Sequence, residues 1–198
     1  MKKERVHIIL AYIMQGLILA LTIFSFYEKE YLLGINGILC LIVTFLPLIL
    51  KRRWNITLPW TLNLLIVFSL CMHAAGESAG LYTFFYPIYD KIGHFIGSIT
   101  IALLGLALLI ALENTNLKLE KSYAIFFIII FTMAIGAIWE IAEFTTDQLL
   151  GTRAQPGLTD TMYDLIFDFL GGLFIALLAN SKFEKVKCRV APKICRKK

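Results

Sequence analysis

Residues 88–112 read IYDKIGHFIGSITIALLGLALLIAL, and this stretch predicts the architecture of the whole chain. From Ile99 to Leu112 it contains no charged residue. An apolar stretch of about 20 residues is long enough to cross the hydrocarbon core of a bilayer as a helix. The beginning of the same stretch carries Asp90, Lys91 and His94. It therefore predicts a membrane helix with one polar end.

Five further apolar runs predict five more spans of the same kind. Hydrophobic residues make up 59% of the 198 residues, charged residues make up 17%, and the mean hydropathy is +0.76. This apolar excess excludes an ordinary soluble domain. We expect an all-α, polytopic membrane helical bundle with six transmembrane helices in residues 1–181, followed by a basic cytoplasmic tail at 182–198. The expected spans are 6–27, 31–50, 58–80, 88–112, 122–148 and 159–180.

The N-terminal run is expected to remain as the first span. Its apolar part is longer than the 7–15 residues of a secretory signal, and no small-x-small cleavage site follows it. The four cysteines meet no metal or disulfide spacing rule, and we expect them to be reduced thiols.

Positive charges predict the topology. With the N-terminus inside, Lys29, Lys91 and Arg153 are the outer cations, and the other 16 of the 19 lysines and arginines (19 − 3) lie on the cytoplasmic side. We therefore expect a multi-pass protein of the plasma (inner) membrane with both termini cytoplasmic. The net charge of +5 does not indicate nucleic-acid binding, because the basic residues lie at helix ends and in the tail, where membrane lipids are their expected partners.

Ionisable residues gather at one end of four of the expected spans, with spacings of three or four. Such spacings place residues on one face of a helix. In the expected topology these ends all lie on the outer side, so we predict one polar pocket within residues 71–172. The residues are His73 and Glu77; Asp90 and His94; Glu140, Glu143 and Asp147; and Asp160, Asp164 and Asp168.

Eight carboxylates in this zone need charge compensation. One charged residue in the middle of a membrane helix already costs about 2.5–3.5 kcal/mol. Lys91 and Arg153 are the fixed cations of the zone, so either several carboxylates are protonated or a bound cation neutralises them. Oxygen donors suit Mg²⁺, Mn²⁺ or Ca²⁺, and an imidazole also admits Zn²⁺. The predicted metal ligands are Glu140, Glu143, Asp164 and Asp168.

Other residues of the zone have predicted roles in catalysis or substrate binding. His94, Asp90 and Glu140 are the predicted catalytic group, in which a metal or a carboxylate–His pair activates water. Arg153, His73 and Glu77 are predicted to bind a lipid-linked or other envelope substrate. Simpler alternatives stay open: His73 as a core histidine, Asp90 as a helix cap, and Asp160 and Asp147 as capping or solvated groups.

Three motifs carry a resemblance to a known family: YDKIGHF at 89–95, WEIAEF at 139–144 and DTMYDLIFDFLGG at 160–172. They resemble the YjdF-like inner-membrane proteins over residues 71–173. More distantly, the chain is similar to VanZ-like membrane proteins, which are associated with envelope stress and teicoplanin resistance. The positions that match the VanZ-like motifs are Asp90, Lys91, His94, Phe95, Glu140, Arg153, Asp164 and Gly171.

The chain departs from the VanZ-like pattern at two positions. Glu143 stands where that pattern has Gln, and Asp168 stands where it has Asn. Both departures add a carboxylate, which strengthens the expectation of a bound cation and weakens any transfer of VanZ-like activity.

The sequence is compatible with three classes of function. The first is an outward-facing acidic and histidine pocket that binds a divalent cation and acts on an envelope substrate. The second is cation or proton transport, although residues 101–112 and 123–131 contain almost no polar side chain that could carry an ion or proton toward the cytoplasm. The third is a non-catalytic assembly protein with a structural polar network. A homo-oligomer is compatible with all three.

Overall fold

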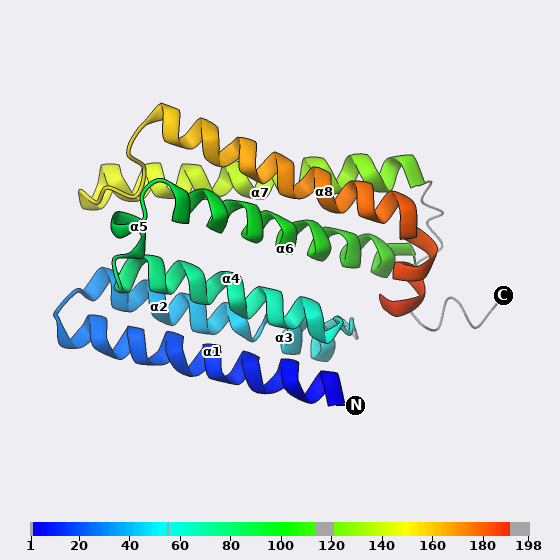
Figure 1. Cartoon of the computed structure of the whole chain (residues 1–198), viewed down its shortest axis with the longest axis horizontal. Coiled ribbons are helices and arrows are strands. Elements are labelled where there is room, and N and C mark those ends of the chain that lie inside the picture. Colours follow the sequence, from blue (N-terminus) through cyan, green and yellow to red (C-terminus); the bar gives the residue numbers. More distant parts are fainter. Residues whose placement is uncertain (1, 55, 114–120, 191–198) are drawn as a thin grey trace. The chain divides into compact units, whose positions relative to one another are not determined.

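The computed structural model describes residues 2–54, 56–113 and 121–190, and the regular structure in these ranges is helical (Figure 1). Six helical stretches in the described part of the chain are long and apolar enough to cross a membrane. The predicted all-α, six-span class is therefore confirmed. The helices are α1 (Lys2–Tyr27), α2 (Tyr31–Thr44), α3 (Leu46–Trp54), α4 (Trp60–Ser78), α5 (Leu81–Phe84), α6 (Ile88–Glu113), α7 (Lys121–Leu150) and α8 (Leu158–Val190).

The helices differ from the expected spans at three places. The second span consists of α2 and α3, which meet at Phe45 just before Pro47. A proline has no N–H to continue a helical ladder and restricts the residue before it, so the ladder is interrupted there. The short α5 was not expected. Helix α8 continues to Val190, so the first part of the predicted tail is helical, while residues 191–198 lie outside the described residues.

The chain divides into two compact units, Met1–Gly93 and His94–Lys198. In the first unit α1 packs against both α2 and α4 (Figure 1). Its core holds Ile18, Cys40, Cys71 and Ala74. Small residues let membrane helices approach closely: a side chain at Gly37 of α2 would collide with Thr22 of α1.

The second unit contains α6 from His94 onward together with α7 and α8, which run side by side and are joined by residues 151–157 (Figure 1). Its apolar core lies in the half away from that loop, since it uses the later turns of α6 and α8 and the early turns of α7. The buried core residues are Ala102, Leu106, Leu109, Ile110, Ala124, Ile128, Ile175, Ala176 and Ala179.

Polar and apolar side chains of the second unit have the distribution of a membrane protein. Ile141 is 63% exposed and Leu177 is 59% exposed, whereas Asp164 is 1% exposed. Outward apolar side chains suit a lipid surround, and inward carboxylates avoid the cost of contact with hydrocarbon. The half of the unit next to the α7–α8 loop therefore holds its polar groups inside.

Candidate functional site

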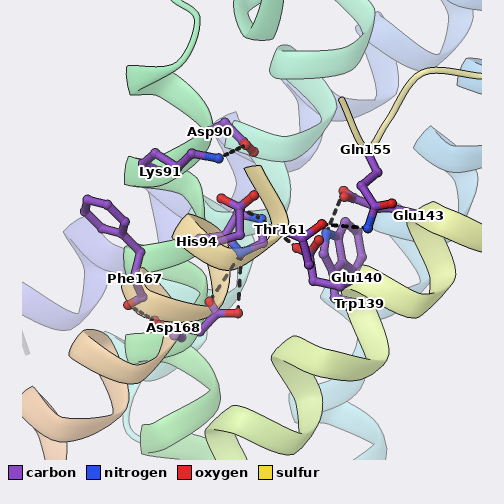
Figure 2. A network of polar contacts seen from close by, with 12 residues as sticks. Asp90, Lys91, His94, Trp139, Glu140, Glu143, Gln155, Thr161, Phe167 and Asp168 are labelled. Carbon is purple, nitrogen blue, oxygen red and sulfur yellow. Dashed lines mark hydrogen bonds and ion pairs between the residues drawn. The ribbon is translucent and has the colours of Figure 1, made fainter. Parts of the chain in front are cut away.

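Four ionisable side chains from three helices meet inside the second unit (Figure 2). His94 lies in α6, Glu140 in α7, and Asp164 and Asp168 in α8. The side chains are 9%, 5%, 2% and 6% exposed in that order. We call these four residues the buried cluster. All four were predicted from sequence as members of one site, and the structure brings them together.

The two ring nitrogens of His94 lie near different carboxylates. Nδ1 lies 3.3 Å and 3.4 Å from the two oxygens of Asp168. An ionised carboxylate only accepts hydrogen bonds, so beside an ionised Asp168 it is Nδ1 that carries the ring proton and donates. Nε2 lies 3.7 Å from Glu140 Oε1 and 3.7 Å from Asp164 Oδ1. A neutral ring that donates from Nδ1 has an acceptor lone pair at Nε2. His94 thus presents an acceptor nitrogen toward Glu140 and Asp164.

Glu140 is the least satisfied group of the cluster. Both of its carboxylate oxygens are buried, and neither has a hydrogen-bond partner among the described residues. The side chains of Thr161 and Gln155 are its nearest hydrogen-bonding groups, although neither contact has ordinary hydrogen-bond geometry, and Nε2 of His94 stands 3.7 Å away. A buried carboxylate without such partners costs free energy that an apolar side chain would not. This carboxylate therefore indicates a ligand.

Glycines make room for Asp168 and for the helix that carries it. A side chain at Gly136 of α7 would overlap the Asp168 carboxylate, and a side chain at Gly171 of α8 would overlap Ser98 of α6. The Ser98 hydroxyl donates to the Phe95 carbonyl and also approaches the Phe167 carbonyl. The absence of side chains at these two positions lets α6 and α7 close on α8 around the carboxylate.

Asp147 fixes the loop that joins α7 to α8. Its Oδ1 accepts hydrogen bonds from the Thr152 hydroxyl (2.5 Å) and the Ala154 N–H (2.8 Å), and its Oδ2 accepts one from the Gln155 N–H (2.9 Å). The Gln155 side chain then donates to the Thr161 hydroxyl at 2.6 Å. The loop is thus tied to α7 through Asp147 and to α8 through Gln155, whose side chain lies near Glu140 (Figure 2).

Two other predicted site residues pair with neighbours on their own helices. Asp90 is in the first turn of α6 and forms an ion pair with Lys91 at 3.0 Å. Glu143 accepts a hydrogen bond from the Trp139 indole N–H at 2.8 Å, on an exposed side of α7.

Two further predicted residues, His73 and Glu77, belong to the first unit. There the ring nitrogens of His73 pair with the Asn36 amide and the Tyr82 hydroxyl, each at 3.0 Å. Arg153 is exposed in the α7–α8 loop, and Asp160 is in the first turn of α8.

Sequence reasoning missed Gly136, Gln155 and Thr161. Neither Gln155 nor Thr161 carries a charge, and their role depends on a loop conformation that no periodicity encodes. Gly136 did have a signal, because it stands one helical turn before Glu140 on the same face. Asp147 was expected to be a solvated or capping group, and its capping of the loop agrees with that alternative.

Comparisons with known proteins agree with the membrane character of the chain. A family model described as "Predicted membrane protein (DUF2238)" matches residues 9–185, which include the whole buried cluster. The chain is also similar to an uncharacterized protein of Thermotoga maritima, with 32% identity over 140 residues that cover 70% of this chain and 71% of the relative. No solved structure matches the chain.

Proposed function

We propose that this chain, which belongs to the DUF2238 family of predicted membrane proteins, binds a divalent cation in the buried cluster of its second unit. The observation that supports this most directly is Glu140, whose two buried oxygens lack hydrogen-bond partners among the described residues. In the proposal the ligands are Nε2 of His94, Glu140 and Asp164. The resemblance to YjdF-like proteins agrees with the family, and no role is taken from VanZ-like proteins.

Charge supports a cation over a purely structural network. Three carboxylates and one imidazole share a site in which every side chain is at least nine-tenths buried. Like charges at such separations cannot all ionise without a counter-charge. A network built only for packing would pair these groups by hydrogen bonds, because an unsatisfied buried charge destabilises the fold. A divalent ion compensates both Glu140 and Asp164 at once.

The distances from His94 to the two carboxylates agree with this assignment. Donors that bind one metal ion at about 2.0–2.2 Å stand roughly 3–4 Å from one another. Nε2 of His94 lies 3.7 Å from an oxygen of Glu140 and 3.7 Å from an oxygen of Asp164, which is too far for a good hydrogen bond. One imidazole with two carboxylates favours Mn²⁺, Fe²⁺ or Zn²⁺ over Mg²⁺ and Ca²⁺.

Burial favours a resident ion over a bulky substrate in direct contact with these groups. The cluster also lies on one side of the apolar core, so among the described residues of the second unit a buried apolar layer separates the cluster from the other end of the helices. Transport and action on an envelope substrate stay predictions. With cytoplasmic termini, as the positive charges predict, the α7–α8 loop and the cluster face the outer side of the membrane.

Metal analysis of the detergent-purified protein tests the proposal. We expect one Mn²⁺, Fe²⁺ or Zn²⁺ per chain after loading and removal of free ion, and an increase in melting temperature on loading. The variant His94→Ala should lose both. Asp160→Asn is the control, because Asp160 is on the same helix as Asp164 but in its first turn. A wild-type protein that neither retains nor is stabilised by any of these ions would refute the proposal.

Asp168 is expected to act through His94 rather than as a ligand. A carboxylate that accepts the N–H of a metal-bound imidazole fixes the tautomer and the ring orientation, and its loss costs about 10–100-fold in metal affinity. We therefore expect Asp168→Asn to weaken binding by that factor without abolishing it, measured by competition with a metal-sensitive dye. Complete loss of binding would instead make Asp168 a ligand, as the sequence suggested.

A further inference from the structure

We infer that Gln155 and Thr161 form a gate through which the buried cluster exchanges its ion with the solution at the α7–α8 end of the second unit. This inference rests on the proposed function and adds the route by which the site is filled and emptied. It is drawn from the hydrogen bonds of the loop, the burial of the ligands and the position of the apolar core.

The ligands are closed off in the structure. Side chains of Glu140 and Asp164 are 5% and 2% exposed, so a hydrated ion does not reach them without a local opening. The three-helix unit has one end at the α7–α8 loop and the other at its apolar core. The two ends differ sharply in composition.

The end away from the loop is sealed by packed apolar side chains. Thr132 stands one helical turn before Gly136, the residue of α7 that meets Asp168; it is 1% exposed and donates its hydroxyl to the Ile128 carbonyl of its own helix. The fully buried Ile128 and Ala176 follow. A dry, close-packed layer of this kind offers an ion no ligand on its way.

The loop end carries a polar contact between two uncharged side chains. The Gln155 side chain donates to the Thr161 hydroxyl at 2.6 Å. Thr161 precedes Asp164 by three residues, so both lie on the same face of α8. Both gate residues also interact with Glu140, so they are next to the ligands (Figure 2). We therefore expect that separation of Gln155 from Thr161, together with their weak contacts to Glu140, opens a way to two of the proposed ligands.

The rest of the loop can stay in place while the gate opens. Asp147 holds the Gln155 backbone through its N–H, and this bond does not involve the Gln155 side chain. Gly151 and Gly157 bracket the loop with φ of 68° and 147°, conformations that glycine adopts without the steric cost other residues incur. The side chain of Gln155 can thus rotate away over an anchored backbone.

The test compares rates with affinity. In detergent-purified, Mn²⁺-loaded protein, release to an excess of chelator and rebinding of Mn²⁺ are followed by stopped flow. Loss of one neutral hydrogen bond predicts that Gln155→Ala and Thr161→Val speed up both steps by about fivefold to tenfold. The equilibrium affinity should stay within about threefold, because a gate contributes equally to entry and exit.

Thr132→Val is the matched control at the sealed end, since it keeps the side-chain volume and removes only a hydroxyl bonded within its own helix. We expect it to leave both rates unchanged. Unchanged rates in both gate variants, or faster release with slower or unaltered binding, would overturn the gate. The latter pattern would mean that Gln155 or Thr161 holds the ion.

A second readout does not depend on metal. A water-soluble carbodiimide should label Glu140 of the metal-free protein faster in Gln155→Ala than in wild type, as quantified by peptide mass spectrometry. Equal labelling would refute the gate even if the ion site exists. Conversely, faster labelling in a protein that binds no ion would support the gate and refute the proposed ligand.

Discussion

The metal-free Glu140→Gln protein should melt at a higher temperature than the metal-free wild type, and its melting temperature should not rise when a metal is added. The two effects have opposite signs for one physical reason. Without an ion, Glu140 buries a carboxylate whose oxygens lack hydrogen-bond partners in the described structure, and glutamine removes that charge at nearly the same volume. With an ion, the same carboxylate is a ligand, and an amide is a poor replacement.

The expected sizes follow from these two roles. Neutralising a buried carboxylate without partners should stabilise the metal-free protein by about 1–3 kcal/mol. A ligand at one hundred times its dissociation constant stabilises the wild type by about 2.7 kcal/mol, and this increment should vanish in Glu140→Gln. Thermal melts of both proteins in the same detergent, with chelator and with excess Mn²⁺ or Zn²⁺, measure the two quantities.

Glu143→Gln is the matched control for this variant. It makes the same chemical change one turn along the same helix, at a carboxylate that accepts a hydrogen bond from Trp139. We expect it to leave the metal increment intact and not to raise the melting temperature of the metal-free protein. If Glu140→Gln destabilised the metal-free protein, its carboxylate would have partners that compensate it, and the main support for the proposed site would be lost.

The sequence predicted the membrane spans and the polar faces because both depend on local periodicity. Charged residues at spacings of three and four had to share a helix face, and the cost of lipid exposure had to turn that face inward. His94, Glu140, Asp164 and Asp168 were found in this way. Periodicity does not say which faces meet, so it could not give the partners of His73, whose ring pairs with Asn36 and Tyr82 in the first unit.

The roles within the buried cluster lay beyond what sequence reasoning can reach. Asp168 was predicted as a ligand, since its charge and depth matched those of Glu140. The structure distinguishes the two through the ring of His94, where Asp168 accepts from Nδ1 and Glu140 faces Nε2. The loop contacts of Asp147 were equally out of reach, because they join residues five to eight positions apart in an irregular conformation.

Gly136→Ala should weaken metal binding although residue 136 has no side chain in the wild type and cannot bind a metal. An added Cβ would stand 2.9 Å from Cγ of Asp168 and closer still to one of its oxygens. The carboxylate must then shift away from Nδ1 of His94, which loosens the ring. We expect a loss of about 10–100-fold in affinity, as for other outer partners of a ligating histidine, and a destabilisation of about 1–3 kcal/mol from overpacking.

Gly97→Ala is the control for a glycine-to-alanine change in a membrane helix near the site. No atom in the described structure lies within 4 Å of a Cβ placed at Gly97, so the added methyl group should leave affinity unchanged and alter stability by no more than about 1 kcal/mol. Equal losses in affinity for the two variants would mean that glycine flexibility, rather than room for Asp168, is what the site needs.

A double-mutant cycle shows whether Gly136 acts through Asp168. In an Asp168→Ala background the carboxylate that the new methyl group would strike is gone. Gly136→Ala should then cost little further affinity, and the combined loss should fall well short of the product of the two single losses. Residues in contact show such non-additivity, whereas independent sites add within about 0.3–0.5 kcal/mol. Strict additivity would mean that Gly136 acts independently of the Asp168 carboxylate and matters only for helix packing.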